Sequence, residues 1–340
     1  MRLWRKLLSF TLRAVVFIAM SVGLFVGAAQ LYALHDDFPL FYHPDELSKV
    51  GQILDDRRNF NHPLLMLEAT QWSIEQWPTT RDAKSVGRRG RQVSEFFSAG
   101  AAVLFAWAGF FSARWRGLIL AGLSAALTPA VLSHSKYFKE DASMVFGTAC
   151  VVCAGAALCA ARRCRWSITP ALLCALAGAA VGVAASAKYA GVVLAVPAIV
   201  AVIAATAFRR GFWWALPLGL VLASAAAVGT WCKINQRAVD NWEEFKASFQ
   251  VEQEHGLTAH RDVTLAKPTG FFADAVWADT MWHTRALIVA APLRAGRTRR
   301  DARAIVARTK AAQTVGFRCS PPLEGGVRGG GASHPKRLEQ

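Results

Sequence analysis

Two adjacent carboxylates, Asp45 and Glu46, follow a proline shortly after the first long apolar stretch of the sequence. A carboxylate held at a membrane–water boundary can take a proton from a hydroxyl or amine while that group attacks another molecule. It can also bind a divalent cation such as Mg²⁺ or Mn²⁺. The plainer interpretation is that both acids stand in the first turn of a helix, where the helix dipole favours negative charge. From the residues alone, both interpretations stay open.

Charged side chains recur at the boundaries of the later apolar stretches. These candidates are Arg91, His134, Lys136, Lys139, Asp141 and Lys188. Arginine and lysine bind phosphate strongly, so such a boundary could hold the phosphate of a lipid carrier. The plainer interpretations are an interface anchor, a solvated charge or a charge at a helix start. Lys188 lies between two apolar segments, where a lysine is costly unless it reaches water or has a function.

Apolar segments long enough to cross a membrane must position these residues. The chain has 340 residues, of which 54% are hydrophobic and 18% are charged, against roughly 25% charged in an ordinary soluble domain. A transmembrane helix needs about 20 apolar residues, and segments near this length occur at 14–34, 94–113, 117–132, 142–161, 168–187, 190–208 and 212–231. The fold class predicted is all-α, a polytopic membrane helical bundle with about seven transmembrane helices.

The distribution of positive charge predicts how the bundle is oriented. The amino end and the turns at 114–116, 162–165 and 209–210 are basic and lack acids, which places them in the cytoplasm. The loop 35–93 and the candidate residues then share the extracytoplasmic face. The net charge of +16 does not indicate a nucleic-acid partner, because residues 291–340 alone hold 11 Lys and Arg against three acids.

Two short amphipathic helices are expected in the loop 35–93. Pro44 suits the first position of a helix, and Leu47, Val50 and Ile53 follow it at helical spacing. A second helix is expected to begin near Pro63. Both could lie at the membrane interface, so the sequence predicts that Asp45 is held at the rim of the bundle.

The chain divides into two predicted parts. Residues 1–283 form a membrane-embedded domain, in which 35–93 is the catalytic extracytoplasmic loop. Residues 284–340 are basic and rich in glycine and proline, a composition typical of a disordered tail. The abrupt change of composition near residue 290 also favours a frame-altered end and a chain that is truncated there.

Five segments carry a resemblance to a known family. They are "HPDE" at 43–46, "NFNHPLL" at 59–65, "GRQVSEFFSAG" at 90–100, "SHSKYFKEDASMVF" at 133–146 and "AASAKYAGVVL" at 184–194. With these segments the chain resembles the GT-C membrane glycosyltransferases, in the branch of the protein O-mannosyltransferases and aminoarabinose transferases. The resemblance covers roughly residues 8–283. Members of the family have more helices than the seven expected here.

The resemblance implies an enzyme of the bacterial inner membrane that uses a polyprenyl-phosphate sugar. The sugar would pass, with inversion, to an extracytoplasmic lipid, glycan or protein. Asp45 matches the family's base or metal-site residue, and Glu46 stands beside it as a second catalytic candidate. Candidates for binding the donor phosphate are Arg91, Lys188, Lys136 and Lys139, with Asp141 and His134 as further site residues. A divalent cation is the expected cofactor.

Two other functions remain open. A transporter or flippase would place its charges midway along the helices, whereas these candidates gather at one boundary. Transporters also often contain repeats, and none is evident in this sequence. A truncated chain could instead be an inactive fragment, or could act only by interaction.

Overall fold

The computed structural model describes residues 2–34, 43–161, 168–207 and 214–258. The regular elements in these ranges are all helices, so the all-α class is confirmed. They are α1 (Arg2–Ala33), α2 (Pro44–Leu54), α3 (Leu65–Gln76), α4 (Ala83–Ala126), α5 (Pro129–His134), α6 (Glu140–Ala161), α7 (Ile168–Ala187), the 3₁₀ helix η1 (Tyr189–Leu194), α8 (Ala195–Thr206), α9 (Ala215–Ile234), α10 (Gln236–Asp240) and α11 (Trp242–Thr258).

Six segments of the described residues are long and apolar enough to cross a membrane. They lie in α1, α4, α6, α7, η1 with α8, and α9. This confirms a polytopic membrane bundle. The count differs from seven because α4 contains the second predicted span and most of the third in one 44-residue element.

The chain reverses inside α4 without an intervening loop. Ala113 leaves the helical conformation, and Arg114 has φ 59° and ψ −143°. The two arms then pack so closely that a methyl group on Gly109 would overlap the carbonyl oxygen of Gly117. Phe17 of α1 packs on this reversal, with ring centroids 5.0 Å from Phe110 and 6.2 Å from Trp115.

Small residues bring the later spans together. α7 packs against both α6 and α9, and a methyl group on Gly178 of α7 would overlap the carbonyl oxygen of Ala223 in α9. Without a hydrophobic drive between helices in lipid, such close backbone approach is a main source of association. The Ala- and Gly-rich composition of these spans therefore has a packing cause.

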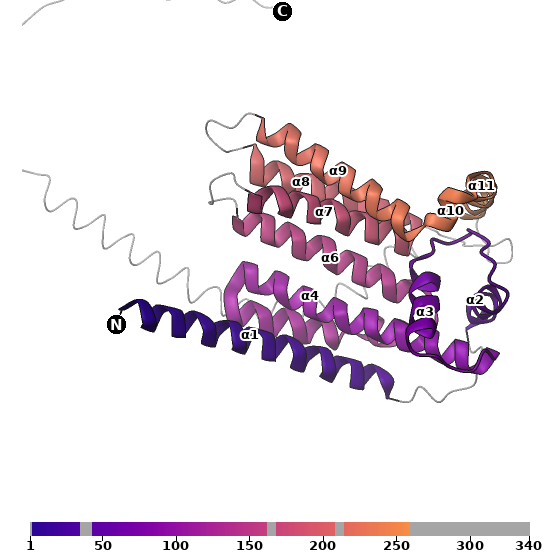
Figure 1. The fold of residues 1–340 in the computed structure, drawn as a ribbon, viewed down its shortest axis with the longest axis horizontal. Helices are drawn as coiled ribbons and strands as arrows, with labels where there is room; N and C mark the ends of the chain where they lie inside the picture. The colour runs from indigo at the N-terminus through magenta and orange to yellow at the C-terminus, as the bar shows by residue number, and fades with distance from the viewer. Residues whose placement is uncertain (1, 35–42, 162–167, 208–213, 259–340) are drawn as a thin grey trace, which may run out of the picture. The chain divides into compact units, whose positions relative to one another are not determined.

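A polar layer caps one end of the bundle. Figure 1 shows α2, α3, α10 and α11 gathered at the end opposite the start of α1. Val50 and Ile53 of α2 and Leu67 of α3 are buried in one apolar cluster with Phe97 and Phe138. The two helices predicted in the loop 35–93 are present, and their buried faces join them to the bundle.

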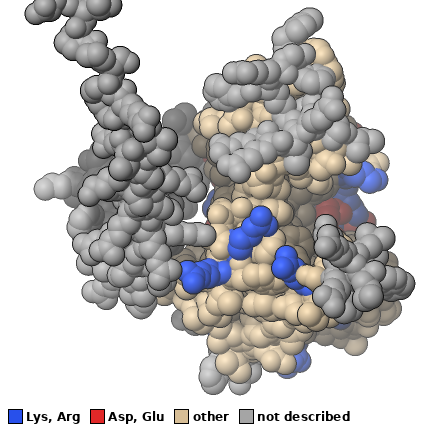
Figure 2. Space-filling view, turned by 90° about the vertical axis from the view of Figure 1, so that its left-hand side faces the viewer, with Lys and Arg blue, Asp and Glu red and all other residues tan. Residues whose placement is uncertain are grey.

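The opposite end carries basic residues. Figure 2 views this end, where several Lys and Arg side chains stand among uncharged residues, and Asp or Glu atoms show only toward one side. Arg114 and Arg116 lie where α4 reverses. The basic turns at 162–165 and 209–210, the boundary at residue 283 and the proposed frame change all fall outside the described residues. The cytoplasmic orientation of this end stays a prediction.

The close contact at Gly178 gives a stability test. Gly178→Ala should lower the free energy of unfolding by about 1–3 kcal/mol, because the added methyl group forces α7 and α9 apart. Gly229→Ala is the matched control, since a methyl group there meets nothing within 4 Å and should stabilise α9 by up to about 1 kcal/mol. Thermal unfolding in detergent measures both. Equal midpoints for the two variants would contradict this packing.

Candidate functional site

The site begins where α2 begins. Pro44 occupies the first turn, and His43 Nδ1 accepts a hydrogen bond from the Asp45 N–H at 3.3 Å. This cap fixes the entry of the chain into the helix. Asp45 and Glu46 therefore stand in the first turn, as the sequence predicted, but their side chains have different environments.

Glu46 points into the protein and is fully buried. Its Oε1 accepts from Arg91 Nε at 2.9 Å, and its Oε2 accepts from Arg91 Nη2 at 2.8 Å. The backbone N–H of Phe138 donates to Oε1 at 3.1 Å. Burial raises the pKa of Glu46, whereas the Arg91 guanidinium and the Phe138 N–H lower it, and the net effect is a lowered pKa. This forked pair joins α2 to α4.

A second buried ion pair lies one turn along α2. Lys49 Nζ is 2.9 Å from Glu140 Oε1 of α6, and both side chains are almost inaccessible. Unpaired charges at these positions would be strongly destabilising. The two ion pairs together fix α2 against both α4 and α6.

Asp45 faces outward from this anchored helix. Its side chain is 38% exposed, and Oδ2 lies 3.6 Å from His43 Nδ1 and 3.8 Å from Lys139 Nζ. Lys139 Nζ also lies 3.3 Å from His43 Nε2. The first candidate base thus has a cation and an imidazole beside it.

Asp141 extends the cluster toward the third corner of the bundle. Its carboxylate lies 3.5 Å from Lys139 Nζ, 3.1 Å from Lys188 Nζ and 3.5 Å from His134 Nδ1. Lys188 remains 46% exposed. Alternating charges therefore run from Asp45 to Lys188. We call the side chains that take part the rim cluster, which consists of His43, Asp45, His134, Lys139, Asp141 and Lys188.

The structure separates two predicted phosphate ligands from the rim cluster. Arg91 is buried beneath it in the pair with Glu46. Lys136 donates to the carbonyl oxygens of Tyr32 and Leu34 at the end of α1. The sequence placed all these residues on one face but could not distinguish the buried cation from the exposed ones.

One small cavity adjoins the rim cluster, and a larger groove lies between neighbouring spans. A pocket of about 90 Å³ lies between Asp45, Lys49, Asn59, His62 and Glu140. An apolar groove of about 380 Å³ lies between α7, η1, α9 and α11, and its lining includes Val181, Tyr189, Val228, Trp231 and Phe249. The "NFNHP" segment lines the first cavity, and the residue after Lys188 lines the second.

Sequence reasoning missed His43, Lys49, Glu140 and Asn235. Lys49 lies three residues after Glu46, which places both on one helical face, and that signal could have found it. Asn235 accepts from the Leu64 N–H at 3.0 Å and donates to Ser186 Oγ at 2.8 Å. Nothing local in the sequence indicates this link between α3, α7 and the end of α9.

Asp45 alone is an incomplete metal site, so a cation bound there would need further ligands such as water or substrate phosphate. No group of three or more His, Cys, Asp or Glu side chains in the described ranges is placed to hold a metal ion. Mg²⁺ often uses one or two carboxylates together with water and substrate phosphates. The metal role of Asp45 therefore stays a prediction.

Comparisons with known proteins place the fold. No family model and no curated protein matches the sequence. A solved structure of the Saccharomyces cerevisiae protein O-mannosyltransferase Pmt1–Pmt2 complex bound to the sugar donor is similar, with a TM-score of 0.50 and 16% identity. The match covers 67% of this chain and 34% of that chain. At this identity the likeness concerns the fold alone, and this chain spans about a third of its neighbour's length.

The buried ion pair predicts a specific pattern of stabilities. Arg91→Met should lower the free energy of unfolding by about 3–5 kcal/mol, because Glu46 is left charged and buried. The double variant Glu46→Met/Arg91→Met should recover much of this loss. Denaturant unfolding in detergent compares the variants. A double variant no more stable than Arg91→Met would contradict the ion-pair explanation.

The lowered pKa of Glu46 predicts acid sensitivity. A carboxyl group with a folded pKa below its unfolded value of about 4.3 contributes stability above the unfolded pKa and loses it as the pH falls through the folded pKa. The unfolding midpoint should therefore fall between pH 5 and pH 3 more steeply in the wild-type chain than in Glu46→Gln. Parallel pH profiles would exclude this contribution.

Proposed function

We propose that this chain is a membrane glycosyltransferase that takes its sugar from a polyprenyl-phosphate donor. One observation carries the proposal: Asp45, Lys139, Asp141 and Lys188 form one partly exposed row of alternating charges at the end of a GT-C-like bundle. Such a row offers a proton acceptor and phosphate-binding cations side by side. The likeness to a structure of an O-mannosyltransferase complex bound to its sugar donor supports the same class of reaction.

Asp45 acts as the base in this proposal. The acceptor's hydroxyl or amine attacks the first carbon of the sugar, and the bond from that carbon to the donor phosphate oxygen breaks. The electron pair leaves with the phosphate, and the acceptor's proton passes to the Asp45 carboxylate. Attack from the face opposite the phosphate inverts the configuration. Partial exposure of Asp45 lets the acceptor reach it.

Lys139 and Lys188 stabilise the departing phosphate. Asp141 lies between their ammonium groups, and each ammonium group has three donors, so contact with Asp141 leaves donors for a ligand. Cations held in place before the reaction stabilise charge as it develops without further rearrangement. A divalent cation at Asp45 would supply additional charge neutralisation for the same phosphate.

Glu46 and Arg91 position the base. The structure pairs each of them with the other in a buried contact, so we assign them the task of holding the first turn of α2. Their effect on transfer then passes through Asp45, the neighbouring residue. The sequence predicted that Glu46 takes part in catalysis and that Arg91 binds the donor phosphate. In this proposal both residues instead position Asp45.

The apolar groove holds the donor's polyprenyl chain. It is lined by membrane-spanning segments and by Phe245 and Phe249 of α11. Tyr189 lines the groove directly after Lys188, so a lipid lying there would have its phosphate near the rim cluster. The extended apolar lining suits a hydrocarbon chain.

Replacement of the base tests the proposed function. Membranes containing each variant would receive polyprenyl-phosphate mannose, glucose or aminoarabinose, and sugar transfer to endogenous acceptors would be measured. Asp45→Asn should lower the rate about 100- to 10,000-fold, the usual contribution of a general base. Asp55→Asn, which removes an exposed carboxylate at the end of the same helix, should change it less than twofold. An Asp45→Asn rate within a few-fold of wild type would refute the assignment.

A further inference from the structure

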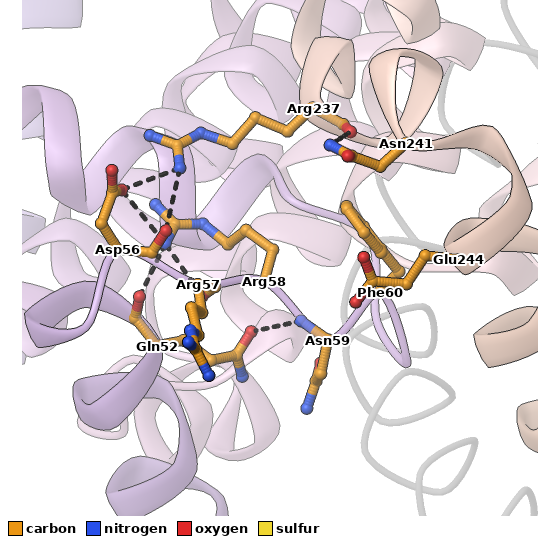
Figure 3. Close-up of a pocket in the computed structure, with 9 residues that line it drawn as sticks. All are labelled: Gln52, Asp56, Arg57, Arg58, Asn59, Phe60, Arg237, Asn241 and Glu244. Carbon is orange, nitrogen blue, oxygen red and sulfur yellow. Dashed lines mark hydrogen bonds and ion pairs between the residues drawn. The ribbon is translucent and has the colours of Figure 1, made fainter.

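An arginine-rich pocket lies on the far side of the loop that follows α2. It has a volume of about 540 Å³, and its lining includes Asp56, Arg57, Arg58, Asn59, Arg237 and Asn241. Figure 3 shows Arg58 and Arg237 converging on Asp56 at one side of this pocket. The lining holds three guanidinium groups and two carboxylates, those of Asp56 and Glu244. Just behind it, Glu68 lies 3.0 Å from Arg58 Nε and 3.5 Å from Arg237 Nε, which leaves Arg57 as the cation with no carboxylate partner in the described residues.

Arg58 supplies a buried positive charge in the pocket wall. Its side chain is 1% exposed. Nε donates to Glu68 Oε1 at 3.0 Å, and Nη1 donates to the carbonyl oxygen of Gln52 at 2.7 Å. Its Nη2 has no hydrogen-bond partner among the described residues. A buried charged donor left without a partner is costly.

The carboxylate of Asp56 lies between two arginines of the pocket. Asp56 Oδ1 accepts from Arg237 Nη1 at 2.7 Å and lies 3.9 Å from Arg58 Nη1. The Asp56 side chain is nevertheless 65% exposed, and its backbone adopts φ 51°. An exposed side chain on a turn can leave its position at small cost. Asp56 therefore marks a position between two arginines where an external oxyanion can bind in its place.

Arg57 is the third cation and has no ion-pair partner within the described part of the chain. It is exposed at the pocket. Arginine binds carboxylate and phosphate groups through two parallel hydrogen bonds. The amides of Asn59 and Asn241 add neutral donors to the same lining.

The pocket adjoins the space beside Asp45. Gln52 and Asn59 line both cavities, and the Asn59 N–H donates to Gln52 Oε1 at 3.2 Å. A molecule anchored at the arginines can therefore extend past Gln52 and Asn59 to the candidate base. The donor phosphate has its own cations at Lys139 and Lys188, so this pocket serves another group.

We propose that the arginine pocket binds a phosphate or carboxylate group of the sugar acceptor and directs the acceptor's nucleophile toward Asp45. The acceptor assignment rests on the proposed function. Binding of the oxyanion itself rests on the pocket alone. Asp56 moves toward solvent when the ligand arrives, and the ligand's oxygens take its place between Arg58 and Arg237, with Arg57 as a further cation of the lining.

Oxyanion binding can be measured without donor or transfer. The full chain, in nanodiscs of zwitterionic phospholipid, would be titrated calorimetrically with inorganic phosphate and separately with acetate at constant ionic strength. Arg57→Gln should weaken binding about tenfold or more, whereas Asp56→Asn, which removes the competing carboxylate, should tighten it several-fold. Arg88→Gln removes an exposed arginine of α4 outside the pocket and should leave the Kd unchanged.

The outcomes separate the ligand classes. Binding of phosphate alone assigns a phosphate-bearing ligand, and binding of acetate alone assigns a carboxylate-bearing one, and either supports the pocket if Arg57→Gln weakens it. Absence of saturable binding, or an unchanged Kd in Arg57→Gln, overturns the proposal.

Asp45→Asn distinguishes this inference from the proposed function. It should abolish transfer and keep the Kd for phosphate. If Asp45→Asn transfers sugar normally while Arg57→Gln loses phosphate, the transferase mechanism falls and the oxyanion site stands. If Asp45→Asn abolishes transfer while Arg57→Gln binds phosphate normally, the oxyanion site falls alone.

Discussion

The buried contact between Glu46 and Arg91 is the constraint on which the polar end of this protein depends. Two ions removed from water gain stability only when their geometry is good and their remaining hydrogen bonds are satisfied. Both conditions hold, since the contact is forked and the Phe138 N–H supplies a third hydrogen bond. Three separate segments must therefore be in place together: the start of α2, the first part of α4 and the chain before α6.

Asp45 gains its environment from that constraint. Because Glu46 is fixed inward, the preceding side chain must face away from the core, and it meets Lys139 of the next corner. Lys49 and Glu140 hold the following turn of α2 in the same register. The exposed row of charges and the buried ion pairs are thus two faces of one arrangement, in which the buried pairs set the positions of the exposed charges.

Hydropathy and charge together predicted most of the architecture. Alternation of spans places the ends of every second helix on one side, which is why residues as distant as Asp45, Asp141 and Lys188 could be assigned to one boundary. The reversal at Arg114 was expected as a turn between two spans, but its closeness depends on Gly109 facing Gly117, which hydropathy does not report.

Side-chain pairing was less predictable from the sequence. Lys49 and Glu140 are 91 positions apart in the chain, and either could equally have been a solvated charge. Arg58 was missed because its burial depends on the course of the loop around it and on Glu68. Pairing between distant segments follows from tertiary packing, and a single sequence records only the residue types that permit it.

Tyr189 connects the apolar groove to the arginine pocket, two cavities whose linings have no residue in common. Its ring lines the apolar groove, and its hydroxyl donates to the carbonyl oxygen of Phe60 at 2.7 Å. Phe60 has φ 50° and lines the arginine pocket. This hydrogen bond helps to hold Phe60 in a backbone conformation that is unfavourable for a non-glycine residue. The apolar groove and the arginine pocket are therefore joined twice at Phe60, through this hydrogen bond and through its ring, whose centroid lies 6.5 Å from that of Phe245 in the groove lining.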